Sequence, residues 1–549
     1  MTWRPGDRPL QNRHATRSTV MAQRGVVATS QPLASAAGLQ ILMDGGNAVD
    51  AAVTAAATLS VVEPTMTGMG GALFAILHNG QTKKIHALNA SGRAPHSASL
   101  ERLAAAVGPG EPMPESGPLS VSVPGAVDGW QQLLRNHGTI SLARALEPAI
   151  HYARHGFAVS EIVAYQWKSV EPLLASRPEA ASVFLPSGTA PRAGEIFRNP
   201  ALAKTLDQVA SDGIDTFYRG AIAQQIAEEF SRLGGWRVLN DLSEHRSNWV
   251  DPIRTTFLGR TVLELPPNTQ GMTALQILNL IDTGDLHKLK HNSPTYLHRL
   301  IESIRIAFAD RAAYLADSEA VPPALLDHLL SADYARLRRD EICPNHAARH
   351  YSAWQNDSKT TTTPVAGKGD TVYLAAADET GTVISLIQSL FGAFGSGVVS
   401  RNTGLVFQNR ASLFSIEPSH PNCLHGGRRP QHTLIPALVL EDQAPVLAFG
   451  VMGGDMQAQG HAQVLTNLFA FGMTLQEAGE AARVRWTGSA IAIESGISRR
   501  VADTLAGFGH SLSNEQGGFG GFQGVQIDHR LGVLQGGSDP RKDGLAIGW

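Results

Sequence analysis

The chain has 549 residues, a formal net charge of −3 and 17% charged residues, a balance that predicts no broad electrostatic surface for nucleic acid or for an anionic membrane. Its hydrophobic fraction of 43% is ordinary for a globular protein with a large core. Its two cysteines form neither a disulfide framework nor a spaced metal cluster. The arginines near the start stand without an apolar stretch, and no run reaches the roughly 18 apolar residues that span a bilayer, so we expect a cytoplasmic protein.

The first third of the chain predicts a loose arm, over residues 1–24, followed by helices and strands in close alternation. Asn47 has the character of a helix cap, with Asp50 three residues later in the first turn. In chain order, the expected segments are a strand over 25–30, a helix over 32–44 that ends at two glycines, a buried helix from Asn47 to about residue 62, a glycine turn over 67–71, and strands over 72–77 and 84–89.

The middle of the chain, from about residue 125 to residue 350, shows helical patterns separated by short loops. Its clearest helix begins at Ser293 as the cap and Pro294 in the first turn, and apolar residues then keep a 3.6-residue period as far as Leu315. After residue 370 the pattern changes, and the expected segments are strands over 371–378, 382–390, 437–440 and 446–450, helices over 461–471 and 475–483, and a glycine-rich tail.

Thr371 is the residue with the clearest chemical meaning. A polar, threonine-rich leader over residues 358–370 runs directly into a strand that begins at this threonine. A threonine hydroxyl is a weak nucleophile without an adjacent base, and cutting the Asp370–Thr371 bond would give the same residue a free α-amine as that base. The segment alone also fits a plain linker before an edge strand. The chain has no G-x-S-x-G or H-E-x-x-H sequence that would indicate another hydrolase class.

Short motifs spread along the chain decide between these two interpretations. They are residues 45–53 (GGNAVDAAV), 61–64 (VVEP), 92–95 (GRAP), 123–125 (VPG), 307–311 (AFADR), 371–378 (TVYLAAAD), 394–397 (FGSG), 453–454 (GG) and 538–540 (SDP). In this order, and over nearly the full length, they resemble the γ-glutamyltransferases, a family of N-terminal-nucleophile hydrolases.

The resemblance implies a mixed α/β fold, a four-layer αββα sandwich. It also implies that a precursor cuts itself once, between Asp370 and Thr371, into a large subunit (1–370) and a small subunit (371–549) that stay together. No metal or organic cofactor is expected for this chemistry, and the expected partner is a small-molecule acid amide, with no nucleic acid and no membrane.

Several residues match functional positions of the family. Thr371 matches the nucleophile, and Gly453 and Gly454 match the pair whose amides form the oxyanion hole, a role for which two N–H groups without a Cβ are suited. Ser389 stands where the family has a threonine that tunes the nucleophile. Arg93 matches an arginine that binds the substrate α-carboxylate, as a guanidinium can with two parallel hydrogen bonds.

The residues that bind the glutamyl group depart from the family pattern. Phe391 replaces an asparagine, Arg410 and Leu413 replace a glutamine and an aspartate, and His432 with Thr433 replaces a pair of serines. A buried ammonium group would lack its acidic partner here. The added guanidinium of Arg410 instead favours a carboxylate or a carbonyl on the substrate.

These changes make the chain resemble a subgroup that includes oxamate amidohydrolase and glutathione-hydrolase-like proteins. We therefore expect a self-processing threonine amidohydrolase that acts either on a γ-glutamyl compound such as glutathione or on an oxamate-like acid amide, and the changes at Phe391 and Arg410 favour the smaller acid. The alternative is a non-catalytic, unprocessed homologue that binds a small acid.

Overall fold

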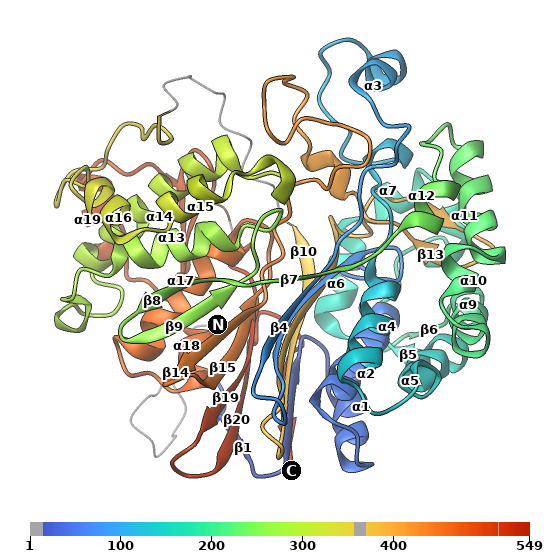
Figure 1. Ribbon diagram of the computed structural model, residues 1–549, viewed down its shortest axis with the longest axis horizontal. Coiled ribbons are helices and arrows are strands. Elements are labelled where there is room, and N and C mark those ends of the chain that lie inside the picture. Colours follow the sequence, from blue (N-terminus) through green and yellow to red (C-terminus); the bar gives the residue numbers. More distant parts are fainter. Residues whose placement is uncertain (1–14, 356–368, 514, 516) are drawn as a thin grey trace.

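Two antiparallel sheets lie face to face at the centre of the molecule, with helices on both outer faces (Figure 1). The computed structural model describes residues 15–355, 369–513, 515 and 517–549. The first seven-stranded sheet has the order β21 (Leu545–Gly548), β2 (Gly25–Thr29), β10 (Asp370–Asp378), β11 (Val383–Phe391), β3 (Ala72–His78), β4 (Ile85–Ala90), β7 (Asn248–Val250). The second has the order β1 (Val20–Ala22), β20 (Val533–Ser538), β19 (Phe522–Asp528), β15 (Ala444–Val451), β14 (Ala437–Glu441), β9 (Arg260–Glu264), β8 (Ile253–Phe257).

Strand β10 shows how the chain builds these layers. Successive side chains of a strand point to opposite faces. Val372 and Leu374 accordingly join the core between the first sheet and its helices, whereas Tyr373 and Ala375 join the core between the two sheets. Both faces of this strand are apolar because both are covered, and the predicted αββα sandwich is therefore confirmed.

The helices divide between the two outer layers. Those that share the core of the first sheet are α1 (Pro32–Met43), α2 (Ala48–Val62), α3 (Leu100–Val107), α4 (Ala126–His137), α5 (Leu142–His155), α6 (Glu161–Ser169), α7 (Glu171–Ala175), α8 (Pro178–Phe184), α9 (Pro200–Asp212), α10 (Asp215–Tyr218), α11 (Ala221–Arg232) and α12 (Leu239–Glu244). Those on the second sheet or beside it are α13 (Gly271–Ile281), α14 (Pro294–Tyr314), α15 (Pro323–Leu329), α16 (Ala332–Arg339), α17 (Met456–Phe469), α18 (Leu475–Glu480) and α19 (Arg499–Gly507). Within the described ranges, no helix has both the length and the apolar character required to cross a bilayer.

Short strands lie outside the two main sheets. They are β5 (Phe157–Ala158) with β6 (Ile196–Phe197), β12 (Val399–Ser400) with β13 (Leu405–Val406), and β16 (Val484–Trp486) with β17 (Ile491–Ile493) and β18 (Leu512–Ser513).

Several elements form as their sequence predicts. The side chain of Asn47 accepts the N–H groups of Val49 and Asp50, and the Asp50 carboxylate accepts the N–H of Asn47, so helix α2 begins with a complete capping box. Ser293 caps α14 in the expected way, by accepting the N–H of Tyr296.

Other expectations prove wrong in detail. The middle of the chain is not only helical, because β7, β8 and β9 lie within it and extend both sheets. The glycine-rich tail forms β19, β20 and β21, and residues 1–24 are not all a loose arm, because β1 pairs with β20. Helix α17 begins at Met456, five residues before the expected start at His461. Most of the predicted polar leader over 358–370, namely residues 358–368, lies outside the described residues.

Candidate active site

Thr371 lies at an irregularity in the pairing of β10 with β11. Asp370 pairs with Phe391, but Val372 pairs with Gln388, so two residues of β11 face the single Thr371. This is a β-bulge, a feature that re-aims a side chain next to many active sites. The peptide bond between Asp370 and Thr371 therefore lies where the regular ladder is interrupted.

The hydroxyl of Thr371 is held by a short chain of hydrogen bonds. It donates to the Ser389 Oγ at 3.1 Å, and the same Oγ accepts the backbone N–H of Phe391 at 2.7 Å. Thr371 is 1% exposed and Ser389 is fully buried, so this orientation is protected from competing water. The structure thus brings Ser389 beside Thr371, as the sequence predicts.

Gly453 and Gly454 form the turn between β15 and the start of α17. Their φ angles are +111° and +59°, values that glycine adopts without the strain that a side chain would cause. Among the described residues, neither backbone N–H is hydrogen bonded to another group. Met456 and Gln457 bond back to the carbonyls of the two glycines and open the helix. These two amides, at the N-terminus of a 14-residue helix, can bind developing negative charge.

A network of three polar side chains, Gln270, Arg311 and Asp455, holds this glycine turn in place. The Gln270 Nε2 donates to the Gly454 carbonyl at 3.1 Å and to the Thr433 carbonyl at 2.8 Å. Arg311 donates to the Gln270 Oε1 at 2.9 Å and to the Asp455 Oδ1 at 2.6 Å. The sequence motifs contain Arg311, and one of them ends one residue before Asp455, but they give no role for either residue, because the contact between them joins segments more than 140 residues apart.

The segment before the scissile bond lies directly against the same turn. A Cβ atom added to Gly369 would lie 2.9 Å from the Gly454 Cα and 3.2 Å from the Gly454 N. These distances place the backbone two residues before Thr371 in close contact with the candidate oxyanion hole.

Arg410, in the short helical turn Arg410–Leu413, is almost completely buried, and it has no ion-pair partner in the parts of the chain that the structure describes. It is 1% exposed, its Nη1 donates to the Thr433 Oγ1 at 2.9 Å, and its Cζ lies 4.2 Å from the centre of the Phe391 ring. Its Nε and Nη2 have no hydrogen-bond partner within the described part of the chain. Burial lowers the pKa of Arg410 and the charge of Asp455 opposes this shift, but a guanidinium stays protonated in proteins. Two buried donors on one edge of a cation are suited to a carboxylate.

His432 lies near this guanidinium. It is 1% exposed, its ring meets Phe74 edge to face at 4.7 Å, and neither ring nitrogen has a partner among the described residues. Burial, and then the charges of Arg410 and Arg429, hold the pKa of His432 well below its usual value. The imidazole is therefore neutral at pH 7, and it can accept or donate one hydrogen bond to a ligand.

Arg93 is not part of this group of contacts. Its Nη1 donates to the Gly427 carbonyl at 2.9 Å and to the Asp317 carboxylate at 3.3 Å, and its side chain is 37% exposed. It lines a separate cavity of about 410 Å³ in which neither Thr371 nor the glycine turn takes part. The role of Arg93 as a substrate clamp stays a prediction.

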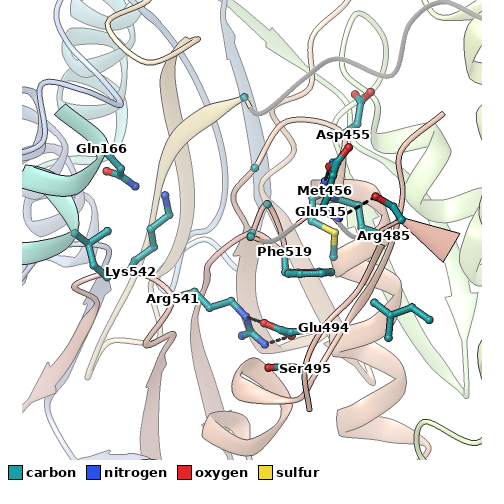
Figure 2. Close-up of a pocket in the computed structure, with 18 of the residues that line it drawn as sticks. Gln166, Asp455, Met456, Arg485, Glu494, Ser495, Glu515, Phe519, Arg541 and Lys542 are labelled. Atoms are coloured by element: carbon teal, nitrogen blue, oxygen red, sulfur yellow. Dashed lines mark hydrogen bonds and ion pairs between the residues drawn. The ribbon is translucent and has the colours of Figure 1, made fainter. Parts of the chain in front are cut away.

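A larger cavity, of about 930 Å³, opens beside the glycine turn and is lined by Gly369 and Gly453. Figure 2 shows Gln166 and Lys542 on one side of this cavity and Asp455, Arg485 and Glu515 on the other. The carboxylates of Asp455, Glu494 and Glu515 are each paired with an arginine, whereas the ammonium of Lys542 has no ion-pair partner in the described ranges. The same ranges contain no cluster of three or more histidine, cysteine or acidic side chains that could hold a metal ion.

A sandwich of two antiparallel sheets between helical layers, with a buried threonine at the start of an inner strand, is the architecture of the N-terminal-nucleophile hydrolases. The family model for gamma-glutamyltranspeptidase matches residues 34–549. The chain is 36% identical to the glutathione hydrolase-like YwrD proenzyme of Bacillus subtilis, over 96% of this chain and 99% of that protein. It is 34% identical to the oxamate amidohydrolase proenzyme of Klebsiella pneumoniae, over 97% of this chain and 100% of that protein.

A solved structure agrees with these sequence comparisons. The cephalosporin acylase from Bacillus halodurans superimposes with a TM-score of 0.89 at 38% identity, covering 100% of this chain and 99% of that one. The chain belongs to the gamma-glutamyltranspeptidase family, as its motifs predict.

Proposed function

We propose that the chain cuts itself between Asp370 and Thr371 and then hydrolyses the amide of a short acid that carries a second carboxylate. The large subunit would be residues 1–370 and the small subunit residues 371–549. Support for the cut comes from the bulge at Thr371 and from relatives whose names describe them as proenzymes. Support for the substrate class comes from the unpaired edge of Arg410.

Self-cleavage begins with attack of the Thr371 Oγ on the carbonyl carbon of Asp370. A C–O bond forms, the hydroxyl proton passes to the Thr371 nitrogen, and the C–N bond breaks, which leaves Asp370 as an ester on the Thr371 side chain. Water then adds to that carbon, releases the Asp370 carboxylate and returns the hydroxyl to Thr371. The product carries a free α-amine beside its own hydroxyl.

Turnover uses the same two groups on an external amide. The Thr371 amine takes the proton from Oγ as Oγ attacks the substrate carbonyl, and the carbonyl oxygen becomes an oxyanion. We assign the N–H groups of Gly453 and Gly454 to this oxyanion, because neither has a hydrogen-bond partner among the described residues and both lie at a helix N-terminus. The amine passes the proton to the departing nitrogen, the C–N bond breaks, and water hydrolyses the acyl ester.

The carboxylate of the acyl group is assigned to the Nε–Nη2 edge of Arg410. This edge offers two parallel donors, and leaving them buried without a partner costs free energy that a bound carboxylate would recover. Thr433 holds the other side of the guanidinium, and the neutral His432 can bond to the rest of the acyl group. The α-ammonium of a γ-glutamyl donor would lie beside this buried cation, an arrangement that is unfavourable.

The departing amine is assigned to the cavity of about 930 Å³ beside Gly453. A cavity of this size can hold a group much larger than ammonia. The ammonium of Lys542 would favour an amine that carries negative charge.

One experiment tests the proposal. Purified protein is incubated with oxamate, with glutathione and with a chromogenic γ-glutamyl anilide, and the released acid and amine are measured beside a Thr371→Ala control. We expect two fragments of about 39 and 19 kDa, if the 58.4 kDa chain divides in proportion to length, with oxamate hydrolysed faster than the γ-glutamyl compounds. An intact chain that is inactive on all three compounds would instead support the non-catalytic alternative.

A cytoplasmic location is also proposed. Cys343 and Cys423 are both unpaired, as is usual for proteins of a reducing compartment. Fractionation of cells that express the tagged protein would test this location.

A further inference from the structure

Phe391 has a backbone conformation that phenylalanine rarely adopts. It is the last residue of β11, it is 8% exposed, and its φ angle is +79°. The left-handed region is unfavourable for a bulky side chain, and such strain persists only where the surrounding structure holds it in place. Two sets of contacts hold Phe391 in this strained conformation, one made by its backbone and one by its ring.

The backbone contact leads to the nucleophile. The N–H of Phe391 donates to the Ser389 Oγ at 2.7 Å, and that oxygen also accepts the hydroxyl of Thr371.

The ring contact leads to the carboxylate subsite. The Arg410 Cζ lies 4.2 Å from the centre of the Phe391 ring, a distance at which the face of the ring attracts a cation. The Thr433 Oγ1 accepts the Nη1 of the same guanidinium. These two contacts fix both the plane and the rotation of the guanidinium, so its Nε–Nη2 edge keeps one direction.

We propose that Phe391 is a positioning residue that acts through Arg410 and Ser389 and does not itself contact the substrate. Its ring fixes the edge of Arg410 that takes the acyl carboxylate, and its N–H fixes the acceptor of the Thr371 hydroxyl. The positive φ sets the direction of the side chain relative to this N–H, and it lets one residue make both contacts. This inference rests on the function proposed above.

The test compares three substitutions in the processed enzyme. Phe391→Leu removes the ring and leaves the backbone N–H, so we expect normal self-cleavage, a KM for oxamate about tenfold higher, and a much smaller change in kcat. Phe391→Tyr keeps the ring and should restore the KM. Phe391→Asn suits the left-handed region and lacks the ring, so it should raise Tm while it weakens oxamate binding.

Phe394 supplies the matched control. It also has a positive φ, of +54°, and is buried, but its ring packs on Trp167 and Phe184 and not on Arg410. Phe394→Leu should lower Tm. It should not raise the KM for oxamate more than it raises the KM for oxamide, the uncharged analogue.

Two results would overturn the inference. One is a KM for oxamate in Phe391→Leu equal to that of the unsubstituted enzyme, and the other is a Phe391→Tyr variant as impaired as Phe391→Leu. Calorimetric titration with oxalate separates this failure from failure of the proposed function. Equal binding of oxalate to the unsubstituted enzyme and to Phe391→Leu contradicts only the role of Phe391. An unsubstituted enzyme that neither binds oxalate nor hydrolyses any amide contradicts both the role of Phe391 and the proposed function.

Discussion

Replacing Gly369 with alanine should slow self-cleavage and leave the processed enzyme unchanged. The added Cβ would lie 2.9 Å from the Gly454 Cα, against 3.4–4 Å for ordinary contact, and both neighbours at Gly454 are backbone atoms that cannot rotate away. The segment would therefore have to move by about 0.5 Å or more, which displaces the scissile carbonyl from the Thr371 Oγ. Overpacking of this kind costs about 1–3 kcal/mol. If this cost falls on the attack geometry, the rate decreases between about 5-fold and 150-fold.

The assay follows the full-length band on denaturing gels after the precursor is refolded or freshly synthesised, and then measures kcat and KM of the fragments once processing is complete. After the cut, the segment that contains Gly369 is no longer joined through Asp370 to Thr371, so kcat/KM should stay within about twofold. Gly507→Ala is the matched control, because no atom lies within 4 Å of the added Cβ in helix α19. Self-cleavage of Gly369→Ala at the rate of the unsubstituted chain would refute this reasoning.

Three further outcomes are expected. Arg410→Lys should raise the KM for oxamate by about tenfold or more, because a lysine cannot present two parallel donors, and an unchanged KM in steady-state assays would contradict the subsite. Burial alone would raise the pKa of Asp539, but Arg541 and Arg483 lower it below its usual value, so this carboxylate stabilises the fold above pH ~4 and the contribution is lost as the pH falls through the lowered pKa. Asp539→Asn should accordingly cost about 3–5 kcal/mol at pH 7, with a difference in Tm that shrinks on acidification, and a pH-independent difference would count against the ion pairs. Ser293→Ala should cost about 1 kcal/mol by removing the cap of α14, measured by denaturant unfolding, and no loss of stability would mean that the cap is dispensable.

The parts of the fold that could be predicted from the sequence are those governed by local signals. The capping box at Asn47, the cap at Ser293 and the successive strands β10 and β11 each depend on signals within a few residues of chain, and all of them form. The sequence does not predict the strands of the tail, because a segment so rich in glycine has the composition of a loop. Gly536 is needed for packing instead, since an added Cβ would lie 2.9 Å from both Ala546 and Val26.

The strands β7 to β9 were missed for a different reason. Helical patterns surround them and favour a helical interpretation of the whole region. Strand β8 nevertheless alternates half-buried and exposed positions before the buried Phe257, and this period of two is typical of a strand. The sequence predicts too late a start for helix α17. Its first turn follows directly on the glycine pair, and glycines before a helix are hard to distinguish by composition from a turn.

The candidate site also combines features that local sequence indicates with features that only the fold shows. Thr371 and the glycine pair each lie in a short motif, and Ser389 stands where the family has a threonine, so the sequence alone could give these residues as candidates. The support of the glycine turn by Gln270 and Arg311, the strained φ of Phe391 and the unpaired edge of Arg410 could not be predicted, because they depend on contacts between distant segments and on backbone angles. The ion pair of Arg93 with Asp317 likewise follows only from the fold.

The most direct test of the account is the intact mass of enzyme purified by its activity. We predict two species whose masses sum to that of the precursor plus one water, with the smaller species beginning at Thr371 and all amide hydrolysis residing in the cleaved material. Active enzyme that consists of one unbroken chain, or a fragment that begins at another residue, would contradict the claim that backbone cleavage creates the base for this threonine.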